Sequence, residues 1–226
     1  MRATTTIEVG LDARGHTVAH RIECEVPLLV RVADTPGPVL TLLLVNGAAG
    51  PLGGDRLRFR LEVGPGAHVI VRSVAATMAQ PGPSGEPSSL DIELVVGGEA
   101  TLDWAPEPIV SVQHSRHRTS MHLTAAATST VSAREVVSLG RHRESPGHLA
   151  LHQRVTIDGS DVLRHDTVFA AGPRLGPGAH GTGRTMSSEV LVGTYLPSPM
   201  SEVTPQRVHA VFHLSPVCAL LTTRMV

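Results

Sequence analysis

The sequence contains no lysine, and all 19 of its basic residues are arginine. A chain without lysine cannot form a Schiff base with a substrate or supply the lysine of a phosphate-binding P-loop. Aromatic residues make up only 2% of the chain, so its core has to be built from valine, leucine, alanine and isoleucine. The formal net charge of -1 gives no support to a nucleic-acid partner or to binding at a membrane surface.

Cysteines and long apolar runs are also scarce. Cys24 and Cys218 lie far apart and form no CxxC pair, so they are not a disulfide framework, and a reducing compartment fits them. The N-terminus lacks an apolar signal run, and no stretch reaches the roughly 18 apolar residues that a membrane span needs. We therefore expect a soluble, cytoplasmic protein with no membrane partner.

Known catalytic signatures do not occur either. The sequence has no HExxH motif, no GxSxG nucleophile elbow and no EF-hand loop. Its 13 histidines invite a metal site, but His114 and His117 would point to opposite faces of a strand. Two further pairs share a strand face and supply only two ligands each, fewer than a closed zinc site needs. These pairs are His148 with His152 and His209 with His213.

What the sequence does contain is a regular strand pattern, clearest over Asn46–Thr77. Over Leu57–Val63 apolar residues alternate with charged ones, which is typical of a strand with one buried face. Gly64-Pro65-Gly66 then reverses the chain, and apolar residues alternate again from Val69, so we predict a hairpin here. Gly53 and Gly54 precede this unit and place the carboxylate of Asp55 at the start of its first strand.

The same strand-turn-strand unit recurs about every 30 residues. One such unit cannot bury its apolar face alone, so the units have to stack. The alanine-rich segment 124–137 is the best helix candidate, yet its threonine, serine and valine favour a strand. The pattern predicts an all-β fold of stacked units forming a two-layered, solenoid-like or sandwich body, with at most one or two short helices. The four units cover residues 57–74, 89–104, 117–138 and 148–170.

Three carboxylates are candidates for chemistry, each with a structural alternative. Asp55 follows a Gly-Gly turn and could simply cap it. Glu107 lies between two prolines, where it could be a solvated loop residue. Glu135 lies within an apolar strand, where it needs either a function or a partner such as an arginine. Carboxylates and imidazoles together could hold a divalent ion, including nickel.

Several motifs occur in an order that resembles the urease accessory protein family UreD, called UreH in some systems. The run from Gly53 to Leu57, the turn at 63–68 and Ala75-Ala76-Thr77 are similar to the family's opening elements. Trp104-Ala105-Pro106-Glu107 resembles its W-x-P-E element, and residues 135–141 resemble its E-x-x-x-L-G-R element. The resemblance covers about Leu42–Ala170, and the C-terminal third departs from the family pattern. The residues of this chain that match the structural motifs of the family are Gly53, Gly54, Gly64, Gly66, Trp104, Gly140 and Arg141.

The resemblance implies one UreD-like domain over residues 1–226 that has an all-β fold and performs no turnover. It implies a maturation scaffold that links apo-urease to the accessory proteins UreF and UreG and assists nickel delivery. Asp55, Glu107 and Glu135 match the family motifs and would line a polar route for nickel or water. The resemblance implies no tightly bound cofactor, with nickel only in transit.

Two alternatives to a maturation scaffold stay open at this point. One is an unrelated all-β module that binds a ligand or partner through its loops. The other is a hydrolase that uses Asp or Glu as acid and base.

Overall fold

The computed structural model describes residues 1–33, 38–169, 184–193, 196–204 and 206–225, and within these ranges it contains eighteen strands and no helix. The first nine strands are β1 (Arg2–Leu11), β2 (Thr17–Cys24), β3 (Leu28–Val32), β4 (Val39–Asn46), β5 (Arg56–Val63), β6 (His68–Ser73), β7 (Thr77–Ala79), β8 (Ser88–Val96) and β9 (Thr101–Trp104). The others are β10 (Ile109–Ser111), β11 (Arg116–Ala125), β12 (Thr130–Leu139), β13 (His148–Ile157), β14 (Ser160–Phe169), β15 (Thr185–Val192), β16 (Met200–Val203), β17 (Arg207–Ser215) and β18 (Cys218–Met225). The segment 124–137 is therefore strand and turn, as its β-branched residues indicated.

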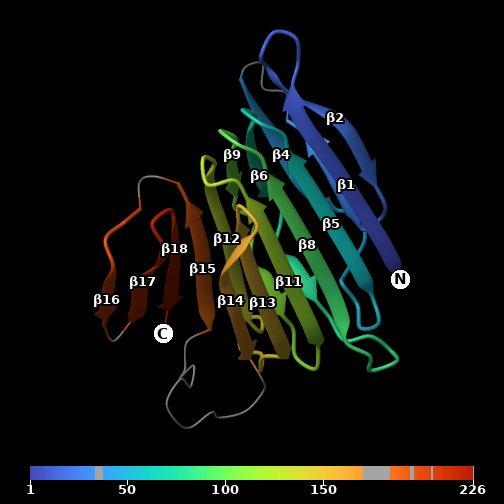
Figure 1. Cartoon of the computed structure of the whole chain (residues 1–226). Coiled ribbons are helices and arrows are strands. Elements are labelled where there is room, and N and C mark those ends of the chain that lie inside the picture. The colour runs from blue at the N-terminus through green and yellow to red at the C-terminus, as the bar shows by residue number, and fades with distance from the viewer. Residues whose placement is uncertain (34–37, 170–183, 194–195, 205, 226) are drawn as a thin grey trace.

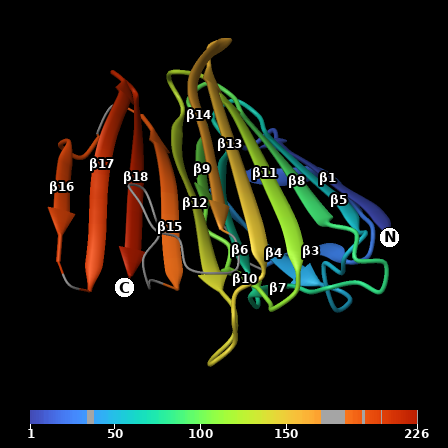
Figure 2. The same ribbon diagram turned by 90° about the horizontal axis from the view of Figure 1, so that it is seen from below.

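The strands form two sheets that pack face to face (Figures 1 and 2). The first sheet has the order β14-β13-β11-β8-β5-β1-β2, and β1, β5, β8, β11 and β13 run parallel. The second sheet has the order β16-β17-β18-β15-β12-β9-β6-β4-β3, and β4, β6, β9 and β12 run parallel. Antiparallel strands flank both parallel regions. The described part of the chain holds no helix with the length and apolar character that a membrane span requires.

The strand-turn-strand units are present, but the hairpin predicted at Gly64-Pro65-Gly66 is wrong. β5 lies in the first sheet between β1 and β8, whereas β6 lies in the second sheet between β4 and β9. The turn thus carries the chain from one sheet to the other, and Gly66 adopts a φ of 70° that suits glycine. The next two units, β8 with β9 and β11 with β12, divide between the sheets in the same way. Successive coils therefore stack in parallel, and the body is solenoid-like.

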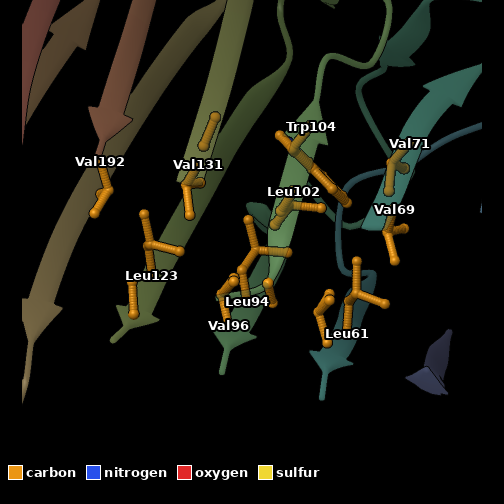
Figure 3. Packing of buried hydrophobic residues seen from close by; sticks show 14 of the residues in the cluster. Leu61, Val69, Val71, Leu94, Val96, Leu102, Trp104, Leu123, Val131 and Val192 are labelled. Atoms are coloured by element: carbon orange, nitrogen blue, oxygen red, sulfur yellow. The ribbon is translucent and has the colours of Figure 1, made fainter. Parts of the chain in front are cut away.

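Rows of aligned apolar residues fill the space between the sheets (Figure 3). A residue at the same register position in each parallel strand points the same way, so equivalent positions form a continuous row across the sheet. Each row of fully buried leucines and valines removes a large apolar area from water. One row of the first sheet consists of Ile7, Leu61, Leu94, Leu123 and Val155, all fully buried. One row of the second sheet consists of Leu42, Val71, Trp104, Ala133, Val190 and Leu220.

The second sheet extends beyond the first through β15, β18, β17 and β16, all antiparallel (Figures 1 and 2). Phe212 and Val203 remain largely exposed on this extension. The extension lies in the C-terminal third, where the sequence departs most from the pattern of stacked units.

Candidate functional site

Glu135 is a buried carboxyl group at the centre of a polar layer between the sheets. It lies in β12 at an inward position of the alternation Val131, Ala133, Glu135, Val137, and it is 6% exposed. Gln153 of β13 in the facing sheet donates a hydrogen bond from Nε2 to Oε2 of Glu135 over 2.6 Å. Oε1 of Gln153 accepts a 2.9 Å hydrogen bond from Oγ of Ser188 in β15. The layer therefore joins three strands across the core.

The surroundings of Glu135 make ionisation costly. Burial raises the pKa of its carboxyl to about 7, and the hydrogen bond from Gln153 opposes this rise. The expected alternative of an ion pair with arginine is wrong, because no arginine of the described ranges pairs with Glu135. The carboxyl can therefore exchange a proton near neutral pH.

A cavity of about 70 Å³ opens beside Glu135, and it is lined mainly by apolar side chains. It exists because β9 ends at Trp104, level with Ala133, so no β9 residue stands beside Glu135. Pro106 continues the wall from there. Trp104 packs against Phe59 with ring centroids 5.3 Å apart, and its buried Nε1 has no hydrogen-bond acceptor among the described residues. The interior lining thus includes the carboxyl group of Glu135 and the side chain of Trp104, whose indole donor is unused.

Glu107 also lines this cavity, but from its exposed rim. The backbone N–H of Glu107 donates to Oγ of Ser73 over 2.8 Å, which fixes the loop between β9 and β10. The structure thus brings Glu107 and Glu135 together at one cavity, one at the solvent side and one in the interior.

Asp55 lies apart from that cavity. Its carboxylate accepts a 2.9 Å hydrogen bond from the backbone N–H of Leu52 and forms a 2.7 Å ion pair with the amino group of Met1. Asp55 thus caps the turn, which is the structural role that the sequence allowed for it. Gly53 is needed here because an added Cβ would lie 2.6 Å from backbone atoms of Gly82 and Glu86. The GGD element therefore closes the loop that enters β5.

The remaining motif residues form turns. Gly140 follows β12 with a φ of 78°, and an added Cβ there would meet the carbonyl oxygen of Glu144 at 2.8 Å. Arg141 pairs with the Glu144 carboxylate over 2.8 Å and lowers the pKa of that group to about 2. The L-G-R element thus reverses the chain between β12 and β13.

A second buried polar group, His117, lies at an inward position of β11. Its Nδ1 is 2.8 Å from Oγ of Ser88 and its Nε2 is 3.3 Å from Oγ1 of Thr119. Burial and, to a smaller extent, the charge of Arg118 together lower the pKa of His117 to about 4. The imidazole is therefore neutral near pH 7, with both nitrogens close to hydroxyl groups. His114 lies in an exposed turn with a φ of 67°, so it does not join His117.

Comparison with known proteins identifies the family. The family model of the "UreD urease accessory protein" matches residues 3–219, a wider range than the motifs alone indicated. The chain belongs to the UreD family. It is 38% identical to the urease accessory protein UreD of Parafrankia sp. over 78% of this chain and 60% of that protein. It is 33% identical to UreD of Frankia alni over 87% and 70%, and 36% identical to UreD 3 of Streptomyces griseus over 80% and 69%.

Family membership supports a role in urease maturation and excludes the alternative of an unrelated all-β module. The name accessory protein describes a maturation factor rather than an enzyme. The chain spans about 60% of the length of the Parafrankia relative. The described residues of this UreD chain contain no cluster of three or more His, Cys, Asp and Glu side chains suited to a metal ion.

The sequence interpretation missed three other polar residues that point inward between the sheets, and one of them, Gln153, is the hydrogen-bond partner of Glu135. Gln153 interrupts the inward alternation Leu149, Leu151, Gln153, Val155 of β13. Ser188 interrupts the corresponding pattern of β15, and His117 that of β11. A polar residue at an inward strand position is the signal in the sequence that could identify all of them.

Proposed function

We propose that this UreD protein is a urease maturation scaffold that links apo-urease to UreF and UreG and assists nickel delivery to the urease active site. The observation that carries the delivery role is the cavity with Glu107 at its rim and Glu135 in its interior. Family membership supports the general role in urease maturation. No turnover by the chain itself is part of this proposal.

The chemistry of the cavity suits an ion in transit. Glu107 at the exposed rim can exchange a water ligand of Ni²⁺ for its carboxylate. Glu135 inside is protonated in part near neutral pH, so a divalent ion that binds it must displace a proton. Two carboxylates among apolar walls bind an ion weakly, and weak binding allows the ion to leave.

Asp55 serves this function differently from the other two carboxylates. Its contacts hold the entry to β5, and it does not line the cavity. We propose that Asp55 stabilises the loop and that Glu107 and Glu135 form the nickel route.

The test is a urease operon expressed with nickel, with and without this gene, followed by assays of urease activity and of nickel per purified urease. Loss of activity with nickel-poor urease on deletion would support the maturation role, and full activity would contradict it. The variants Glu135→Gln and Glu107→Gln keep the side-chain shapes, so both should lower nickel content. Glu62→Gln on the outer face of β5 is the matched control and should not.

The same purified proteins distinguish a defect in complex assembly from a defect in nickel passage. Co-purification of UreF, UreG and apo-urease with the Glu135→Gln protein should equal that of the wild type, because Glu135 is buried. Normal nickel content in both cavity variants would overturn the proposed route while leaving the scaffold role in place. Absence of co-purification with the wild-type protein would overturn the scaffold role.

A further inference from the structure

A row of arginines crosses the outer face of the first sheet, on the side away from the core. The register aligns Arg2 of β1 with Arg56 of β5, Arg56 with Ser89 of β8, and Ser89 with Arg118 of β11. Arg58 of β5 follows one outward position later. All four arginines are exposed, and they surround a depression of about 600 Å³ (the strands are side by side in Figure 1).

This surface carries an unbalanced positive charge. Asp91 is the acidic residue in the wall of the depression, and it pairs with Arg118 over 3.0 Å. Arg2, Arg56 and Arg58 pair with no carboxylate of the described residues. Arg56 instead donates to the backbone carbonyl oxygens of Asp55 and Pro87, which holds its guanidinium in place. Three positive charges thus remain unmatched.

Arg116, one outward position before Arg118 at the start of β11, also pairs with no carboxylate of the described residues and lies at the same end of the sheet. Farther along the strands, arginines of the outer face are matched. Arg60 pairs with Glu62 and Glu93, while Arg154 and Arg164 both pair with Asp161. The excess charge is therefore confined to one end of the sheet.

Ser89 supplies an independent observation at the same place. It is 5% exposed, it lines the depression between Arg56 and Arg118, and its Oγ has no hydrogen-bond partner among the described residues. Buried hydroxyl groups are usually paired, and a partner from outside the chain would satisfy this one.

We propose that this surface, Arg2, Arg56, Arg58, Ser89 and Arg118, binds an acidic segment of a partner protein. The arginine row spans three strand spacings, about 14 Å, which exceeds the size of a single oxyanion. An extended segment with carboxylates at three alternate positions spans the same length, about 14 Å. Guanidinium groups bind carboxylates with paired hydrogen bonds, and the Ser89 hydroxyl can donate to the central carboxylate. The proposal is independent of the nickel route.

Binding to the full chain can be measured by fluorescence anisotropy with a fluorescein-labelled peptide that carries glutamate at three alternate positions. The same peptide with glutamine at those positions is the ligand control. We expect binding of the glutamate peptide only, weakening at least tenfold between about 30 mM and 300 mM salt, because exposed charges are screened.

Variants locate the site. Arg2→Ala/Arg58→Ala removes two unpaired guanidinium groups and should weaken peptide binding about tenfold, whereas Ser89→Ala should weaken it roughly two- to fivefold. The matched control Arg60→Ala/Arg154→Ala removes the same charge from the same sheet face and should change binding less than about twofold. Equal losses in both double variants, or no binding at low salt, would overturn the proposal. Displacement of the peptide by inorganic phosphate at a lower concentration than by unlabelled peptide would also overturn it, in favour of a small-oxyanion site.

Discussion

Two buried ionisable groups lie between the same two sheets, and their surroundings differ. His117 has a hydroxyl group beside each ring nitrogen, and burial lowers its pKa to about 4. Glu135 receives one hydrogen bond, borders a cavity, and burial raises its pKa to about 7. Burial favours the neutral form in both places, but near pH 7 this leaves the imidazole fixed and the carboxyl able to exchange its proton. The difference separates a polar group that stays neutral from one that can exchange a proton near neutral pH.

The pH dependence of stability should show the largest effect, at Glu135. The folded protein keeps a proton on Glu135 that the unfolded chain releases above pH 4.5. The contribution of Glu135 to the free energy of unfolding is therefore full below pH 4.5 and is lost as pH rises through about 7. Glu135→Gln removes the cost of ionisation and should raise the free energy of unfolding at pH 8 by up to about 3 kcal/mol relative to the wild type. Denaturant titrations of the wild type and the variant between about pH 4.5 and 8 measure this difference. A difference in the free energy of unfolding that stays constant with pH would mean that the carboxyl is well solvated.

His117 should show the opposite trend with pH. Its pKa in the folded state lies below the ordinary 6.5, so its contribution to stability is full above pH 6.5 and is lost as pH falls through about 4. His117→Leu should cost about 2 kcal/mol near pH 8, because the hydroxyl groups of Ser88 and Thr119 lose their partner. The deficit should shrink toward pH 5, where the wild type has lost much of this contribution. A deficit that is constant over this range would contradict the neutral imidazole.

Glu107 should show the smallest effect on stability. Its side chain is exposed at the cavity rim, and its structural contact uses the backbone N–H rather than the carboxylate. Glu107→Gln should therefore leave the free energy of unfolding within about 0.5 kcal/mol of the wild type at every pH. Glu99→Gln, in another exposed turn, is a matched control. A pH-dependent change in the Glu107 variant alone would show that this carboxylate is coupled to Glu135.

The recurring strand pattern predicted the all-β, two-layered body because alternation over residues such as Leu57–Val63 specifies which face of each strand is buried. It did not reveal that Gly64-Pro65-Gly66 joins different sheets. The same short turn sequence is compatible with a hairpin and with a corner of a solenoid, because the two connections differ only in which strands pair. β5 pairs with β1 and β8, which are distant in the sequence.

The candidate site was predicted in part. Glu135 was recognisable because it interrupts an apolar alternation, and the same reasoning applies to Gln153 and Ser188. Their meeting in one hydrogen-bonded layer was not visible, because the three residues lie on strands whose proximity depends on long-range pairing. The family motifs group Asp55 with Glu107 and Glu135, although Asp55 lies at a separate turn.

The amino-acid sequence by itself determined the strand faces, the turn glycines and the presence of a charged group in an apolar strand, because these follow from local alternation and backbone sterics. Tertiary structure decided which groups share a space. The end of β9 at Trp104 opens the cavity beside Glu135, and the register of four strands gathers the arginines around Ser89. Both depend on how separate coils align, and that alignment results from packing across the whole core.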